Sequence, residues 1–323
     1  MELHIRHTTH YRYEDSVDLA QHVVHLSPRA SAWQTVRAHT LSITPTPDQQ
    51  HTDLDHFGNH RTFFSHQSPH DALLVQADSV VNTQAPNTLP ASVDETAWEQ
   101  VREHFRYRAQ APFEAASEYL FASPYVPRHD TFVSFAKPAF SPGRGFLQAC
   151  TALMRRIHTE LRYESQSTEV NTPALQALAQ GKGVCQDFAH IMIGCLRSLG
   201  LPARYVSGYL LTQPPPGRPR LIGADASHAW VSVYLPSALV GALAAHVPGI
   251  WVDFDPTNDR WGWGSPGEDY VTLAVGRDFA DVSPMRGVIQ GGAQHTLEVG
   301  VTVAPPEEFV RLTTMQNPSR SPT

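Results

Sequence analysis

The alternation of apolar and polar residues over the first ninety positions predicts a β-rich region. Four apolar residues near the amino terminus share one parity, as a strand with one buried face requires: Leu3, Ile5, Tyr11 and Tyr13. Further β-like runs occupy residues 36–43, 61–65 and 73–81. The stretch Asp-His-Phe-Gly-Asn at 55–59 is a turn signal, because Gly and Asn tolerate positive φ. We therefore expect residues 1–92 to form an all-β N-terminal domain.

Helical spacing replaces this alternation after about Thr96. Residues 95–105 place three apolar side chains on one stripe, whereas the segment 108–145 is rich in Pro and aromatic residues. We assign residues 93–144 to a helical and irregular connector. A longer helix is predicted over residues 146–161, where apolar residues recur at i, i+3 and i+4.

The remainder of the chain has the order of elements of an α+β domain. A short helix is ended by Gly181-Lys182-Gly183, and a second helix opens at Cys185. Five β-like runs follow: residues 203–211, 228–235, 250–254, 270–275 and 296–303. A helix packed on such an antiparallel-looking sheet indicates the α+β class. We expect this second domain to span residues 145–304 with its C-terminal strands, and residues 305–323 to be a polar tail.

Composition narrows the class of protein further. The 323 residues are 41% hydrophobic and 17% charged, which is enough for a sizeable core. The net charge of -7 repels phosphate backbones, so no nucleic-acid partner is expected. No run approaches the roughly 20 apolar residues needed to span a bilayer, so no membrane partner is expected either. Three sparse cysteines and the absence of a signal-peptide pattern predict a cytoplasmic protein. These patterns do not indicate an oligomeric state.

The three cysteines occupy different contexts. Cys150 and Cys195 fall on apolar helical stripes, so both are predicted to be core residues. Cys185 follows two glycines and begins a helix, where unpaired backbone N–H groups and the positive end of the helix dipole favour thiolate over thiol. Its own N–H would point toward the oxyanion that forms when a thiolate attacks a carbonyl. The alternative is that Cys185 is only a small buried residue.

Two further residues stand where partners of such a thiolate are needed. His228 begins a β-like run, and a neutral imidazole beside the thiol would act as a general base. Asp255 ends the next run, and its carboxylate would fix the tautomer and orientation of the imidazole. Asp253 competes for this role but lies a full pleat further back. Each residue also has a structural alternative, a strand-end His bonded to backbone and an Asp before Pro that caps a turn.

Several blocks of sequence, in the same order, resemble the transglutaminase-like cysteine superfamily. The core blocks are Gly-Val-Cys-Gln-Asp-Phe-Ala at 183–189, Leu-Arg at 196–197, Gly-Leu-Pro-Ala-Arg at 200–204, Gly-Tyr at 208–209, His-Ala-Trp at 228–230, and 251–257 ending in Asp-Pro-Thr. The flanking blocks resemble a bacterial subgroup with an N-terminal β-domain: Ser-Pro-Arg at 27–29, the turn at 55–59 and the segment 276–284. The resemblance therefore spans nearly the whole chain.

The resemblance implies a papain-like core at residues 145–304, in which the helix bearing Cys185 packs on an antiparallel sheet. It makes Cys185 the nucleophile, His228 the base and Asp255 the residue that orients the base, with no cofactor and no metal. The implied reaction is hydrolysis of a peptide or isopeptide amide, in a peptide or protein substrate, through a thioester. Hydrolysis is favoured because it needs no second specific site. The alternatives are transglutaminase-type acyl transfer from a glutamine amide to an amine, and a non-catalytic peptide-binding homologue.

Other features near these residues extend the hypothesis. Trp230 and Trp251 either shield the thioester or belong to the core. Asp187 is expected to cap the first helical turn, and Gln180 to lend a side-chain donor to the oxyanion. The loop at 212–225 is the candidate for a lid or substrate rim, with a plain surface loop as its alternative.

Overall fold

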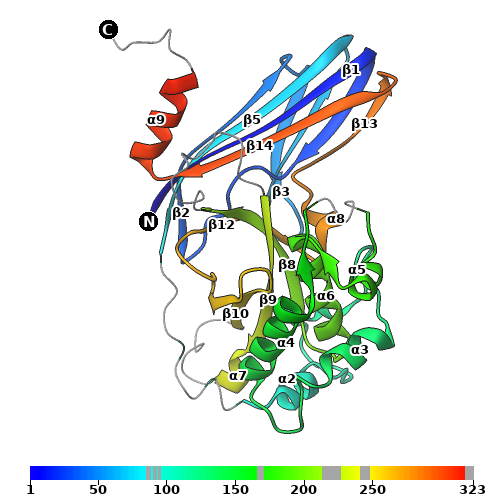
Figure 1. The fold of residues 1–323 in the computed structure, drawn as a ribbon. Helices are drawn as coiled ribbons and strands as arrows, with labels where there is room; N and C mark the ends of the chain where they lie inside the picture. The colour runs from blue at the N-terminus through cyan, green and yellow to red at the C-terminus, as the bar shows by residue number, and fades with distance from the viewer. Residues whose placement is uncertain are drawn as a thin grey trace.

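The computed structural model describes residues 1–84, 89, 93, 96–165, 171–212, 227–240 and 248–316. Across these residues two antiparallel β-sheets dominate the fold, the N-terminal sheet above the second sheet in the view of Figure 1. The α-helices gather beside the second sheet, except for α9 (Pro306–Gln316), which lies beside the end of the N-terminal sheet. No helix of the described chain is long and apolar enough to cross a membrane.

The N-terminal sheet is organised around one long strand, β1 (Glu2–Val24). Its other strands are β2 (Gln34–Thr44), β3 (Gln49–Leu54), β4 (His60–His66), β5 (His70–Thr83), β13 (Met285–Gly291) and β14 (His295–Ala304). The first half of β1 pairs with β5 and β14, and its second half pairs with β4 and β13. The register with β5 shifts between Arg12 and Val17, so one strand serves two halves of the sheet.

Alternating burial explains why these segments form strands. Along β5 every second side chain is buried, and Leu73, Val75 and Ala77 pack with Phe64 of β4 and Val17 of β1 in one apolar cluster. That cluster also includes Tyr13, Ala20 and Val24, so it runs along the middle and the second half of β1. The predicted all-β character of this region follows from the same alternation.

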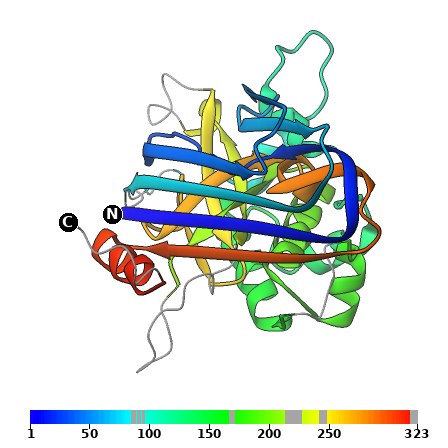
Figure 2. The ribbon, with the colours of Figure 1, turned by 90° about the horizontal axis from the view of Figure 1, so that it is seen from above.

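The C-terminal strands lie elsewhere than the sequence analysis placed them. The run at 296–303, which we assigned to the second domain, is β14, and it pairs with β1 along its length, as Figure 2 shows from above. The strand β13 was not predicted, and α9 occupies most of the segment expected to be a polar tail. Alternation of apolar and polar residues identifies a strand but does not show which strand it pairs with. The pairing of β14 with a strand of the N-terminal sheet therefore has no local signal in the sequence.

The second sheet has the order β11-β10-β9-β8-β12 and carries the helix that begins at Cys185. Its strands are β8 (Ala203–Leu210), β9 (Ser227–Pro236), β10 (Gly249–Asp255), β11 (Arg260–Trp263) and β12 (Tyr270–Gly276), and the helix is α6 (Cys185–Ser198). Along β9 the side chains of Val231, Val233 and Leu235 join the core cluster that contains the buried face of α6. Trp230, of the opposite parity, belongs instead to a second cluster with Val206, Tyr270 and Val275.

Helices complete the second region, and some of them lie in the expected connector. They are α2 (Trp98–His104), η1 (Ala115–Leu120), α3 (Asp130–Ala136), α4 (Phe146–Glu160), α5 (Ala174–Gln180), α7 (Ser237–Val240) and α8 (Phe279–Val282), with a two-strand bridge of β6 (Arg162–Tyr163) and β7 (Lys182–Gly183). The helix predicted at 146–161 is confirmed as α4. The helix α3 lies in a segment that we read as irregular, because seven residues are too few to display a clear helical period.

Two side-chain amides connect the N-terminal sheet to β12. Asn59 donates to the carbonyl of Val275 and accepts from its N–H, both at 2.8 Å. Gln34 makes the same pair of bonds to Thr272, also at 2.8 Å. The predicted turn at 55–59 presents Asn59 for this contact, since the Asp55 carboxylate accepts from the N–H and the amide of Asn59. The N-terminal sheet therefore fixes the edge strand of the second sheet.

Candidate active site

Cys185 occupies the first position of α6, and the residues just before it pack tightly against the first turn of that helix. The Asp187 carboxylate accepts from the N–H of Val184 at 2.8 Å, which confirms the predicted cap. A Cβ at Gly183 would lie 2.7 Å from that carboxylate, so only glycine fits there. The first bond inside the helix runs from Phe188 N–H to Val184 O, so the N–H of Cys185 has no acceptor within the helix. This N–H is therefore left to donate to a group outside the helix.

His228 joins Cys185 to Asp255. The Cys185 side chain lies close enough to His228 to raise the pKa of the imidazole, and His228 Nε2 lies 2.7 Å from Asp255 Oδ2. The His228 side chain is 10% exposed and that of Asp255 is fully buried. Because Nε2 donates to the carboxylate, Nδ1 is the ring nitrogen left for the thiol. The structure thus brings together the three residues that the sequence analysis selected.

The electrostatics of this group favour a charged imidazole. Burial lowers the pKa of His228, but the hydrogen bonds and negative charges of Asp255 and Cys185 outweigh it and raise this pKa to about 10. Burial acts to raise the pKa of Asp255, and the donors around its carboxylate outweigh that effect, so the pKa is lowered. A protonated imidazole next to a thiol stabilises the thiolate, which is the nucleophilic form.

Two residues that the sequence analysis missed also bind Asp255. The Tyr270 hydroxyl and the Asn258 side-chain amide each donate to Oδ2 at 2.7 Å. The N–H groups of Thr257 and Asn258 donate to Oδ1 at 2.8 and 3.3 Å. The turn after Asp255 is a local feature that sequence can suggest, because Asp often accepts from the backbone two and three residues on. Tyr270 has no such local signal.

Asp253, the competing carboxylate, faces different partners. It accepts from Trp230 Nε1 at 3.0 Å and from the Ser232 hydroxyl. Burial raises the pKa of Asp253, although these hydrogen bonds and the charge of the buried Arg204 oppose the change. Among the contacts of the described chain, Asp255 and not Asp253 binds His228.

The other predicted neighbours of the site differ in position. Trp230 is fully buried and stacks on His228 with ring centroids 6.1 Å apart. Trp251 packs instead between Tyr234 and Tyr119, with Arg204 over its ring. Gln180 ends α5 with its side chain exposed, and its proposed bond to an oxyanion stays a prediction. Apart from Thr212, the candidate lid at 212–225 lies outside the described residues.

Cys150 and Cys195 are both fully buried, which confirms them as core residues. Burial raises the pKa of each of these thiols, so neither competes with Cys185 for reagents that need a thiolate. All three cysteines are free. Tyr163 of β6 is half exposed, and burial together with the charge of Cys185 raises its pKa, so it lies at the rim of the site.

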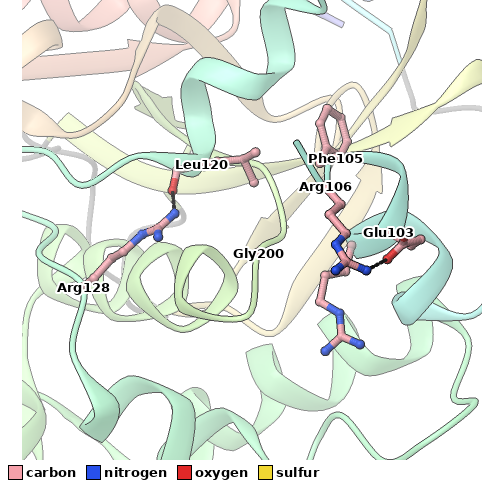
Figure 3. Close-up of a pocket in the computed structure, with 7 residues that line it drawn as sticks. Glu103, Phe105, Arg106, Leu120, Arg128 and Gly200 are labelled. Atoms are coloured by element: carbon pink, nitrogen blue, oxygen red, sulfur yellow. Dashed lines mark hydrogen bonds and ion pairs between the residues drawn. The ribbon is translucent and has the colours of Figure 1, made fainter. Parts of the chain in front are cut away.

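A cavity of about 410 Å³ lies at the far end of α6, next to Gly200, and is shown in Figure 3. Arg106 pairs there with Glu103 at 3.6 Å, and Arg128 donates to the carbonyl of Leu120 at 2.9 Å. Cys185 begins the same helix, so the length of α6 separates this cavity from the candidate active site. Within the described residues, no group of three His, Cys, Asp or Glu is arranged to hold a metal ion.

Comparisons with known proteins match two parts of the chain to described families. Residues 3–82 match the bacterial transglutaminase-like N-terminal region, and residues 134–256 match the transglutaminase-like superfamily. Uncharacterized proteins of Mycobacterium tuberculosis and Mycobacterium bovis are each 37% identical over 306 residues, covering 93% of this chain and 92% of the relative. A Mycobacterium leprae protein, also uncharacterized, is 31% identical over 304 residues, covering 93% and 98%.

A solved structure is similar over most of its length. It is a protein from Cytophaga hutchinsonii described as a "putative cysteine protease", with a TM-score of 0.68 and 20% identity, covering 94% of this chain and 90% of the other. Identity at this level shows a shared fold and not a shared activity. Together these matches confirm the predicted class: an α+β core of transglutaminase-like type preceded by an all-β N-terminal region.

Proposed function

The chain belongs to the transglutaminase-like superfamily, and from that premise we propose that it is a cysteine-dependent hydrolase with a Cys185-His228-Asp255 triad. The observation that carries the proposal is the continuous contact from the Cys185 thiol through His228 to the buried Asp255 carboxylate. A buried His held in its charged form by two partners is suited to activating a thiol.

The reaction follows from the positions of these groups. The Cys185 thiolate attacks an amide carbonyl, and the N–H of Cys185 stabilises the resulting oxyanion. His228 gives its proton to the leaving amine, the C–N bond breaks, and a thioester on Cys185 results. Water then loses a proton to His228 and attacks the thioester, the C–S bond breaks, and release of the carboxylic acid restores the thiolate–imidazolium pair. Asp255 holds the imidazole in the tautomer that both steps require.

Hydrolysis is favoured over acyl transfer because water needs no binding site of its own. The substrate we propose is a peptide or isopeptide bond in a peptide or protein, cleaved in the cytoplasm without a cofactor. In the alternative, a primary amine replaces water and a glutamine amide is the acyl donor. The second alternative is a peptide-binding protein that retains the fold without turnover.

One experiment separates these three functions. The full chain is incubated with casein in the presence and absence of a fluorescent primary amine, alongside the Cys185→Ala variant. Mass spectrometry reads peptide cleavage, conversion of glutamine to glutamate, and amine incorporation in the same sample. Cleavage or deamidation that is lost in Cys185→Ala supports the hydrolase. Incorporation of the amine, with a matching decrease in cleavage and deamidation, supports acyl transfer. Substrate binding by wild type and Cys185→Ala alike, with no product, would support the binding protein.

A further inference from the structure

The oxygen of Asp255 that binds His228 is shared by three donors. His228 Nε2, the Tyr270 hydroxyl and the Asn258 amide all lie 2.7 Å from Oδ2. The other oxygen, Oδ1, accepts from backbone N–H groups of the following turn. Each donor that binds Oδ2 restrains the orientation of the carboxylate. Each also weakens Oδ2 as an acceptor for the other donors, the imidazole included.

Tyr270 reaches this oxygen from the opposite edge of the sheet. It begins β12, and the strands β8 and β9 lie between β12 and β10, which carries Asp255. Its ring packs edge-on against Trp230, with centroids 5.4 Å apart, and lies 6.0 Å from the His228 ring. The absence of a side chain at Gly208 permits this packing, because a Cβ there would lie 2.5 Å from the Trp230 ring.

A charged pair holds the Tyr270 ring from its other side. The Arg260 guanidinium lies 4.9 Å from the ring centroid and makes two hydrogen bonds to Asp269, at 2.5 and 2.7 Å. Burial and the neighbouring Asp255 carboxylate raise the pKa of Tyr270, so the phenol stays a donor. The ring therefore has a fixed position, a fixed protonation state and a hydroxyl aimed at Oδ2.

We propose that Tyr270 and Asn258 are positioning residues, which orient Asp255 through its Oδ2 and limit how strongly that oxygen binds His228. This inference rests on the proposed triad and extends it to two residues that touch neither the thiol nor a substrate. Removal of the Tyr270 hydroxyl leaves Oδ2 a stronger acceptor in a less restrained carboxylate. The imidazole then holds its proton to higher pH, and it is aligned less well for proton transfer.

The titration of His228 tests this without any substrate. The groups that face its ring are Asp255, Cys185 and Tyr270, and Arg260 with Asp269 lie behind Tyr270. We expect Tyr270→Phe to move the NMR titration of His228, assigned with His228→Gln, upward by about one pH unit. Asn258→Ala changes an exposed residue and keeps its backbone N–H as a donor to Oδ1. This variant should also raise the pKa of His228, by less than Tyr270→Phe does. It also keeps the test valid if Tyr270→Phe fails to fold.

The matched control is Tyr234→Phe, which removes another tyrosine hydroxyl of the same sheet, one that lies near the carboxylate of Glu114 beside η1. It should leave the His228 titration at the wild-type value. In turnover, Tyr270→Phe should lower kcat about tenfold and leave KM unchanged, because the residue does not touch substrate. A loss of thermal stability with an unchanged titration in both Tyr270→Phe and Asn258→Ala would overturn the proposal. Inactivity of wild type with a shifted titration would instead refute the function and leave the positioning role standing.

Discussion

Buried histidines in the two sheets have opposite electrostatics. In the N-terminal sheet, burial lowers the pKa of His7 and His22 to about 4, and for His22 the neighbouring His66 and His70 add to the effect. In the second sheet His228 is also buried, yet its pKa is raised to about 10 by Asp255 and Cys185. Burial alone makes an imidazole neutral, and only ionised partners reverse this. Among eighteen histidines, the partner therefore distinguishes a candidate catalytic residue better than depth does.

Replacing the two kinds of buried cysteine should separate activity from stability. Cys185→Ala should lower turnover by on the order of 10⁴-fold or more, because no other group supplies the nucleophile. Cys195→Ala removes a fully buried sulfur and should keep turnover, while lowering the free energy of unfolding by about 1 to 2 kcal/mol. Turnover assays and urea unfolding of both variants measure this. Full activity in Cys185→Ala would refute the triad.

The second prediction concerns the reactivity of Cys185. Iodoacetamide at pH 6 should label Cys185 and spare Cys150 and Cys195, since the imidazolium of His228 stabilises the thiolate. His228→Ala should slow this labelling about 100-fold. His104→Ala is the matched control, because His104 also lies 2.7 Å from a carboxylate, that of Glu114. The rates are read by mass spectrometry. Equal labelling of the three cysteines in wild type would favour the binding-protein alternative.

The third prediction uses the opposite signs of the two pKa shifts. A folded-state pKa below that of the unfolded chain, as for His22, gives stability that is present above about pH 6.5 and is lost as the pH falls toward about 4. His22→Phe keeps the ring stacked on Phe64 and removes this titration. At pH 5 the variant should therefore be more stable than wild type by up to roughly 2 kcal/mol, relative to their difference at pH 7.

His228 should show the reverse behaviour in the same urea-unfolding series. Its raised pKa gives stability that is present below about pH 6.5 and is lost as the pH rises through about 10. His228→Gln should therefore flatten the alkaline side of the profile, and His22→Phe the acidic side. The exposed His51 provides the control, and His51→Phe should leave both sides unchanged. An unchanged acidic side in His22→Phe would contradict the assignment of a buried neutral imidazole.

The sequence predicted those parts of the fold and site that have a local signature. Alternation identified β5, and helical spacing identified α4. The chemistry of a helix start identified Cys185. Pairing between distant strands has no such signature, which is why the partnership of β14 with β1 was not predicted. Tyr270 was missed for the same reason. Its contact with Asp255 forms only when the whole sheet has assembled, with β9 and β8 between the strands that carry the two residues.

The two carboxylates of β10, Asp255 and Asp253, should differ sharply in their effect on turnover. Asp255→Asn places an amide against His228 Nε2 and should lower kcat by on the order of 10⁴-fold, since the imidazole loses its acceptor. Asp253→Asn should leave kcat within about threefold of wild type, because Asp253 binds Trp230 and Ser232 and not the imidazole. The same change deprives the buried Arg204 of a nearby negative charge, so stability should fall by about 1 to 3 kcal/mol. Measured per folded molecule, a large loss of kcat in Asp253→Asn would mean that the Trp230 stack orients His228 as strongly as Asp255 does.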